Sequence, residues 1–413
     1  MIYTDDVDLN EKKERNMDYN FDKKIDRSHT PTEKWSKEKL EKLFGRGDVL
    51  SFWVADMDVR APGPLITDLI RRAEHGIYGY EYRTEAHHEA LIQWLSRRHG
   101  WKVSKENLLY CPGILAALAI LINLFTKKGE NIIIQPPVYP PFSILVKNND
   151  RTLVNNPLKI VNGRYVMDYE DLDEKASDPK TKMMIISNPH NPVGRVWSRE
   201  ELIKLGEICL KHDVWLISDD AHADIIFKGH KYIPFASISK EFSDRSITTL
   251  SPAKTFNTAG LITAAVISTN KETMTGFKKF LDQYFLDRQN VFSNVGFESA
   301  YSKGEMWLEQ YLDYLEENLR FLNDFIKERI PVVKIFETEG TYLVWLDLSA
   351  LGLAGKELSE YIVHEAKIAL FPGYWFGKEG AYYARWNIGC PRSILEEGLK
   401  RLETAVKKKI NSK

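Results

Sequence analysis

The residues with the clearest chemical meaning surround one lysine, Lys254, in the stretch SPAKTFNTAG (251–260). The lysine comes just after the strand-like run SITTL (246–250) and has small, hydroxyl-bearing and glycine neighbours. Burial or a nearby cation lowers the pKa of an amine and makes it a nucleophile, and lysine is the residue that forms Schiff bases with carbonyl groups. A lone lysine at a strand end usually has its head in solvent. Carbonyl chemistry at Lys254 is therefore a hypothesis that its companions must support.

Two further reactive side chains follow another apolar strand. Asp219 comes directly after VWLIS (214–218), with Asp220 beside it and His222 three residues later. A buried carboxylate needs a cationic or hydrogen-bonding partner, and the protonated ring nitrogen of a cofactor is one such partner. A helix cap or a structural ion pair would also explain Asp219, and His222 alone would be interpreted as a core histidine. We expect Asp220 to be structural.

Two loops have the residues that bind polar groups of a small molecule. The loop NPHNPVG (188–194) follows MMIIS (183–187), and its Asn-Pro steps favour turns, while the amide of Asn191 could also donate to an anionic oxygen. The sequence CPG (111–113) opens the apolar run 114–125, and a Pro and a Gly before free helix amides favour anion binding. With a single glycine, this second loop is weak evidence for phosphate.

Three other side chains suit a planar, charged ligand. Ser251 offers a hydroxyl, and Tyr139 in PPVYPPF could stack on a ring or simply shape a proline turn. Arg385 lies on a late strand, YYARWNIG, where it could bind a carboxylate in bidentate fashion or face solvent. His87 and His88 are adjacent on a helix and do not share a face, so we predict no metal site.

The elements that must position these residues alternate along the middle of the chain. Short apolar strands are separated by helical patterns such as 199–212, which indicates a parallel sheet covered on both faces. The predicted strands are 131–135, 183–187, 214–218 and 246–250. In such sheets a ligand binds beyond the carboxyl ends of the strands. We therefore expect Asn191, Asp219 and Lys254 to converge on one place.

The ends of the chain have a different pattern. After about residue 270 come long helical stretches, then late strands and a final helix, which indicates a second, α+β domain. The predicted division is a mobile tail (1–19), an N-terminal part of the small domain (20–60), a cofactor-binding large domain (61–295) and the C-terminal small domain (296–413).

Composition narrows the classes of function. The chain has 413 residues and a net charge of −1, which argues against nucleic acid or an acidic membrane surface as a partner. Its 3 cysteines form no CxxC pair and suit a reducing compartment. The sequence has no signal-peptide pattern, and its longest apolar run is too short to span a bilayer. We expect a cytoplasmic protein.

In their order and spacing, these motifs resemble the pyridoxal-phosphate enzymes of fold type I, the aspartate aminotransferase superfamily. Within the class I/II aminotransferases they are most similar to the C–S β-lyase (cystathionine β-lyase) branch. The resemblance runs from about Phe21 to the C-terminus and rests on FWVADMDV, YGYEYRT, CPGILAAL, PPVYPPF, NPHNPVGRVW, ISDDAHAD, SPAKTFNTAGL and ARWNIGCPR. It implies an α/β fold with a large domain, whose mainly parallel seven-stranded sheet is sandwiched by helices, and a smaller α+β domain.

The resemblance also implies contacts with pyridoxal 5'-phosphate. Lys254 would form the Schiff base, Asp219 would pair with the pyridinium nitrogen, and Asn191 would bind the phenolate oxygen. The residues implied near the ring and its phosphate are His222, the ring-stacking Tyr139, the amides of Gly113, Ile114 and Leu115, Ser251, and Tyr80 of YGY from the neighbouring subunit. The contribution of Tyr80 implies a homodimer with shared active sites.

For the substrate, the resemblance implies an amino acid. Arg385 would bind its α-carboxylate, and Ala55 and Asp56 of the VADMD segment would lie near it. Two departures from the aminotransferases are notable. Aminotransferases often have tyrosine at the position of His222, whereas the C–S lyase branch tends to have histidine there. Many relatives have a phosphate-binding arginine at the position of Ile262.

The implied reaction is α,β-elimination from sulfur amino acids to thiol, pyruvate and ammonia, with Lys254 as the general base. Two alternatives stay open from the sequence. An amino-acid aminotransferase would use every residue named above. A regulatory protein acting through protein contacts would leave no mark that the sequence reveals.

Overall fold

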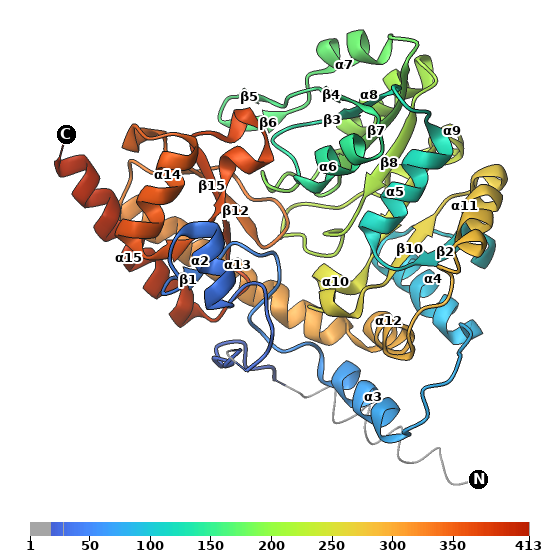
Figure 1. Ribbon diagram of the computed structural model, residues 1–413, viewed down its shortest axis with the longest axis horizontal. Coiled ribbons are helices and arrows are strands. Elements are labelled where there is room, and N and C mark those ends of the chain that lie inside the picture. The colour runs from blue at the N-terminus through green and yellow to red at the C-terminus, as the bar shows by residue number, and fades with distance from the viewer. Residues whose placement is uncertain (1–17, 28, 413) are drawn as a thin grey trace.

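The structure, a computed structural model, describes residues 18–27 and 29–412 and has a seven-stranded sheet at its centre (Figure 1). The strand order is β2 (Leu108–Cys111), β10 (Ala264–Ile267), β9 (Ser246–Leu250), β8 (Trp215–Asp219), β7 (Thr181–Ser187), β3 (Asn131–Ile134) and β4 (Thr152–Asn155). β10 is antiparallel to β2 and β9, and the other neighbouring pairs are parallel. The predicted mainly parallel sheet is confirmed. Most of the predicted mobile tail lies outside the described residues.

Both faces of this sheet are covered, as its continuous apolar strands predict. On β3, Ile132 and Ile134 pack into a core with α5 (Ile114–Phe125) and α6 (Pro141–Asn148). Ile133 points to the opposite core with α7 (Tyr169–Ala176) and α8 (Arg199–Lys211). Successive strand side chains point to opposite faces, so a strand that is apolar at every position needs helices on both sides. The covering helices are α4 (Glu85–His99), α5 (Ile114–Phe125), α6 (Pro141–Asn148), α7 (Tyr169–Ala176), α8 (Arg199–Lys211), α9 (Lys240–Asp244), α11 (Lys271–Gln283) and α12 (Val291–Lys303).

Local signals set the helix ends. Thr84 caps α4 by accepting from the His87 N–H, and Ser198 begins α8 with a capping box to Glu201. The helix predicted at 199–212 is thereby confirmed. Within residues 18–27 and 29–412 no helix is long and apolar enough to cross a membrane, and the apolar run 114–125 is the buried helix α5.

A second, antiparallel sheet lies beside the first and is built from the late strands. Its order is β11 (Lys334–Ile335), β12 (Leu343–Asp347), β15 (Tyr383–Asn387) and β14 (Phe371–Pro372). Figure 1 shows that the blue N-terminal segment packs with this orange and red part of the chain, where β1 (Leu50–Ser51) pairs with β13 (Ile368–Ala369). The remaining α-helices and strands are α2 (Lys37–Phe44), α3 (Gly63–Glu74), the hairpin β5 (Lys159–Val161) and β6 (Arg164–Val166), α10 (Pro252–Thr255), α13 (Glu305–Arg329), α14 (Gly355–Tyr361) and α15 (Arg392–Asn411).

The exact domain boundaries stay a prediction. The boundary predicted at residue 295 falls inside α12, and this helix packs against α3 and α4. A helix is one rigid unit, so we propose that the second domain begins at Gly304, where α12 gives way to α13.

Candidate active site

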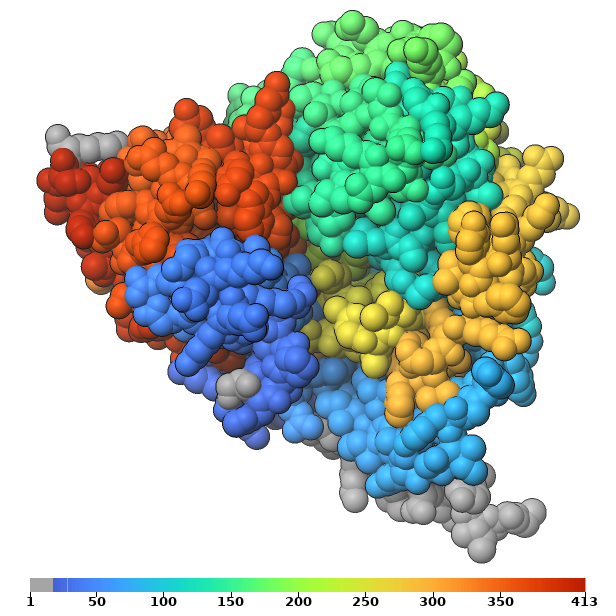
Figure 2. Space-filling model, in the orientation of Figure 1, coloured from blue at the N-terminus to red at the C-terminus, as the bar shows by residue number. Residues whose placement is uncertain are grey.

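The carboxyl ends of β7, β8 and β9 open into one cavity of about 820 Å³. Figure 2 shows the segment around α10 at the bottom of a hollow between the blue N-terminal segment and the teal-to-green part of the chain. The cavity collects the predicted residues Ala55, Gly113, Ile114, Leu115, Tyr139, Asn191, Asp219, His222, Ser251, Lys254 and Arg385. The prediction that the ends of three strands meet at one place is therefore confirmed.

Lys254 enters the cavity from the short helix α10. Ser251 caps this helix by accepting from the Ala253 N–H, and Pro252 occupies its first position, so the chain turns sharply at the end of β9. The Nζ atom of Lys254 donates to the carbonyl oxygen of Ala55 at 2.6 Å. Burial, and then the charge of Arg385, lower the pKa of the amine to about 8, although Asp56 and Asp219 oppose this shift. The amine is thus partly neutral near neutral pH, as a nucleophile or base requires.

A buried carboxylate that sequence analysis missed anchors α10. Asp224 accepts from Thr255 Oγ1 at 2.7 Å and from Trp94 Nε1 at 3.0 Å, and His99 Nε2 lies 2.8 Å from the same carboxylate. Because Thr255 follows Lys254 directly, these contacts fix the base of the lysine. The sequence signal was present, since Asp224 follows the Asp219 strand end by five residues, but a single acid gave no indication of its partners.

Asp219, the last residue of β8, is a buried acid without a cation. In the described part of the chain its carboxylate accepts from the Ala221 N–H at 3.1 Å and forms no ion pair. Burial raises its pKa to about 7, and the Ala221 N–H and the charge of Lys254 reduce this effect. A carboxylate buried with so few partners is unfavourable by itself, which indicates that a cationic ligand belongs beside it.

The neighbours of Asp219 differ in kind. Asp220 accepts from the Ser218 hydroxyl at 2.5 Å and from the Tyr232 hydroxyl, so its partners are internal, as expected of a structural acid. His222 is buried and lines the cavity, and no described residue forms a hydrogen bond with its Nδ1. Burial holds the pKa of His222 well below its ordinary value, so this imidazole is neutral.

Arg385 is a buried cation without an acid. Its side chain is 1% exposed, and it donates to Asn191 Oδ1 at 3.0 Å and to the Trp53 carbonyl at 2.6 Å. Its Nε has no partner, and within residues 18–27 and 29–412 no carboxylate pairs with it. Burial lowers the pKa of Arg385 to about 10. An unpaired buried guanidinium is costly, so this position is suited to the carboxylate of a ligand.

The start of α5 offers backbone donors to the same cavity. Gly113 precedes the helix with φ +90°, a conformation that favours glycine, and no side chain caps the first amides. The Ser251 hydroxyl donates to the Thr263 carbonyl at 2.7 Å, so it would have to turn to reach an anion. Ile262 lines the cavity with an exposed side chain and φ +46°, which is unusual for a β-branched residue.

Two predicted residues lie outside this cavity in the single chain. Asp56 lines a neighbouring cavity, and both of its carboxylate oxygens accept from Arg27. Tyr80 is 93% exposed and lines a separate surface cleft. The sequence also gave no role to Asn387, whose amide donates to the Val54 and Asp56 carbonyls. Asn387 stands two residues after Arg385 on β15, so strand alternation would have indicated that both side chains lie on one face.

Comparisons with known proteins agree with this geometry. The sequence model of "Aminotransferase class I and II" matches residues 70–402. The chain is 42% identical to cystathionine beta-lyase PatB of Bacillus subtilis (strain 168), over 94% of this chain and 100% of the relative. It superposes on cystalysin of Treponema denticola, whose crystal structure contains pyridoxal 5'-phosphate, with a TM-score of 0.91 and 33% identity, covering 95% and 100% of the two chains. The pyridoxal-phosphate-bound C–S lyase of Staphylococcus hominis gives a TM-score of 0.88 and 34% identity, covering 95% and 99%. The chain therefore belongs to the aminotransferase class I and II family.

Proposed function

We propose that this protein is a pyridoxal-phosphate-dependent C–S β-lyase that converts sulfur amino acids to a thiol, pyruvate and ammonia. The observation that carries the proposal is the meeting of three incomplete groups in one cavity: the amine of Lys254, the unpaired carboxylate of Asp219 and the unpaired guanidinium of Arg385. Each of these groups lacks the partner that a cofactor-bound amino acid would provide.

The residues present fit the cofactor. Asp219 would hold its ring nitrogen, Lys254 would bind its aldehyde carbon, and Asn191 and His222 would lie beside the ring with Tyr139. The amides of Ile114 and Leu115, which no described side chain caps, would bind its phosphate, with Ser251 nearby. The Gly113 N–H donates to the Cys111 carbonyl at 2.8 Å and would have to leave this partner to join them. When bound, pyridoxal phosphate supplies an electron sink for negative charge that develops at the substrate Cα.

Two side chains bind the substrate and transfer its protons. Arg385 binds the α-carboxylate and so places the substrate Cα next to Lys254. Once the substrate amine has taken its place, the Lys254 nitrogen is free to take the proton from Cα, and the C–S bond breaks with its electron pair leaving on sulfur. The same nitrogen can then give its proton to the departing thiolate. The three-carbon enamine that is left takes up water and yields pyruvate and ammonia.

An incubation of the purified protein with cystathionine tests the proposal. We expect equal amounts of thiol and pyruvate without any added keto acid. A second incubation with 2-oxoglutarate and a panel of amino acids measures transamination, which would form glutamate and release no thiol. Glutamate formation that exceeds thiol release would favour the aminotransferase alternative. If the protein were inactive in both incubations, a regulatory role through protein contacts would be the remaining alternative. The cytoplasmic location stays a prediction that these incubations do not address.

The substrate carboxylate site gives a direct prediction for Arg385→Lys. Lysine keeps the positive charge but cannot bind a carboxylate in bidentate fashion. We expect the loss of one charge-assisted hydrogen bond to lower kcat/KM by about 10- to 100-fold, with most of the change in KM. Steady-state kinetics with cystathionine measures it. Arg392→Lys, in an arginine that donates to Asn318 outside the cavity, is the matched control. An unchanged KM would contradict the assignment.

We also propose that two copies form a homodimer in which Tyr80 completes the partner's site. The segment 77–82 has four exposed apolar or aromatic side chains, Ile77, Tyr78, Tyr80 and Tyr82. Such a run on a surface is typical of a protein interface. Ile262 stands where many relatives have a phosphate-binding arginine, so a hydroxyl from a second chain would have more to contribute.

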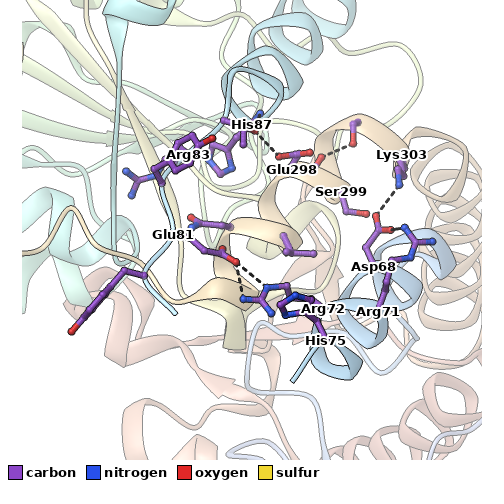
Figure 3. A pocket seen from close by; sticks show the side chains of 16 residues that line it. Asp68, Arg71, Arg72, His75, Glu81, Arg83, His87, Glu298, Ser299 and Lys303 are labelled. Carbon is purple, nitrogen blue, oxygen red and sulfur yellow. Dashed lines mark hydrogen bonds and ion pairs between the residues drawn. The ribbon is translucent and has the colours of Figure 1, made fainter. Parts of the chain in front are cut away.

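The cleft beside this segment supports a protein occupant. It measures about 710 Å³, and Figure 3 shows charged side chains around it, with Arg72 directed to Glu81, and Arg71 and Lys303 to Asp68. Charged side chains of both signs around a cleft suit a protein partner, so we infer that a second copy covers it.

Mixing two inactive variants tests the shared site. Lys254→Ala chains have an intact Tyr80, and Tyr80→Ala chains have an intact Lys254. In a hybrid dimer, one of the two sites would contain both residues, so we expect activity to return on mixing, up to about half of the hybrid's sites. Turnover after subunit exchange is the measurement. A monomer by light scattering, or no recovery after proven exchange, would contradict the shared site.

A further inference from the structure

A partly buried ion cluster ties the N-terminal segment to the loop that touches Lys254. Arg27 donates to both carboxylate oxygens of Asp56, at 3.1 and 2.8 Å, and to Asp58 at 2.8 Å. Lys34, which is 0% exposed, donates to Asp58 Oδ2 at 2.7 Å and to the Asp56 carbonyl at 3.0 Å. Two cations thus face two acids, and the cluster has no net charge. Lys34 and Asp58 are buried, whereas Arg27 and Asp56 are 21% and 22% exposed. A buried salt bridge is unfavourable unless its geometry is good, so removing a cation leaves the acid beside it without its partner.

The loop held by this cluster carries the oxygen that Lys254 contacts. The Ala55 carbonyl accepts from Lys254 at 2.6 Å and also from the Tyr342 hydroxyl at 2.9 Å. The same loop is fixed from the lysine's own segment, because Asn257 accepts from the Met57 N–H at 3.1 Å. Any shift of residues 54–58 therefore moves the acceptor of the lysine amine.

The cluster also places charge beside that amine. Lys254 lines the main cavity and, in addition, a neighbouring cavity of about 920 Å³ that Arg27 and Asp56 line as well. Asp56 acts on the lysine through its charge and favours the ammonium form. The other titratable groups that line the main cavity with the lysine are Glu33, Tyr139, Asp219, His222 and Arg385. Tyr342 shares the Ala55 carbonyl with it.

We propose that Arg27 is a positioning residue for Lys254: by pairing with Asp56 it holds the Ala55 carbonyl against the amine and cancels the charge of the acid beside it. The N-terminal segment is then part of the active-site wall, and Asp56 acts on the lysine rather than on the substrate. The catalytic consequence rests on the proposed function, because it matters only if Lys254 moves the substrate proton.

The signs of the charges give a sharp test. In Arg27→Gln, Asp56 loses its main cation and stabilises the ammonium form of Lys254, so the pH at which the amine titrates should rise by about one unit. In Asp56→Asn, the cations are left in excess and the same pH should fall. In the double variant the charges balance again, and the titration should return close to that of the wild type.

The measurement does not require turnover. The full-length protein, freed of pyridoxal phosphate, is treated with acetic anhydride over a range of pH, and mass spectrometry gives the extent of labelling at Lys254. The visible absorbance of the cofactor-loaded protein, titrated in parallel, provides a second readout. Arg46→Gln, which breaks the exposed pair of Arg46 with Asp48, is the matched control and should not move either titration.

Shifts in the same direction for both single variants, or shifts no larger than that of Arg46→Gln, would overturn the proposal. If a single variant does not fold, Arg27→Lys decides. Lysine keeps the charge but cannot span both oxygens of Asp56, so we expect an unmoved titration with kcat reduced several-fold, and an unchanged kcat would contradict the positioning role. A wild-type protein that binds no cofactor would refute the proposed function and leave the labelling result intact.

Discussion

Lys254→Ala should lower kcat/KM for sulfur amino acids by at least about 10³-fold, because it removes both a nucleophile and a positioned general base. The same variant should lose the visible absorbance of the bound cofactor, and borohydride should no longer fix the cofactor to the chain. The physical reason is local: Lys254 is the lysine that lines the main cavity, and burial and Arg385 keep its pKa near 8. Kinetics, absorbance and the mass of the borohydride-treated chain are the measurements.

The control for Lys254→Ala is a lysine in an ordinary setting. Lys211 is exposed and pairs with Asp173 on the surface, so Lys211→Ala should leave turnover and absorbance unchanged. If borohydride still attached the cofactor covalently to the Lys254→Ala chain, another amine would hold the cofactor. Full turnover in Lys254→Ala would refute both roles of the lysine.

Much of the large sheet and of its site could be predicted because the signals are local. The strands β7, β8 and β9 are short apolar runs that turn polar at one end, and parallel strands bring those ends to one edge. Asp219 and Lys254 could be placed together for that reason alone. The antiparallel direction of β10 could not be predicted, because its apolar residues would suit a strand of either direction.

The ion cluster around the loop 54–58 could not be predicted from the sequence. Arg27 and Asp56 are 29 residues apart and belong to segments without apolar periodicity. A charged residue such as Lys34 is normally exposed, so nothing in its neighbourhood predicted a side chain that is entirely buried. Its burial results from the meeting of two segments, and only the assembled chain reveals this. The partners of Asp224 were hidden for the same reason.

Asp219→Asn should separate function from stability. Asparagine cannot carry the negative charge that holds a cationic ring nitrogen, so we expect kcat/KM to fall by about 10²- to 10³-fold and the cofactor to be lost more readily. Asp220→Asn is the matched control, because Asp220 is bonded internally to Ser218 and Tyr232 and should change turnover less. Near-normal turnover in Asp219→Asn would mean that the acid is structural.

Asp219→Asn should lower activity, as argued above, but it should raise the stability of the cofactor-free protein at alkaline pH. Burial raises the pKa of Asp219 from 3.8 to about 7, so the folded chain binds this proton more tightly than the unfolded chain. The wild type therefore loses stability as the pH rises from about 4 to about 7, by an amount on the order of 4 kcal/mol, and Asp219→Asn should lose none of it. We expect cofactor-free Asp219→Asn to melt at a higher temperature than the wild type at pH 8, with the difference vanishing near pH 4. Thermal melts across this range measure the effect, and a wild type that is equally stable at pH 8 would show that Asp219 already has a partner within the chain. Asp219 would thus lower the stability of the cofactor-free protein and still be required for activity when the cofactor is bound. This combination is expected of a carboxylate whose role is to bind a cationic ligand.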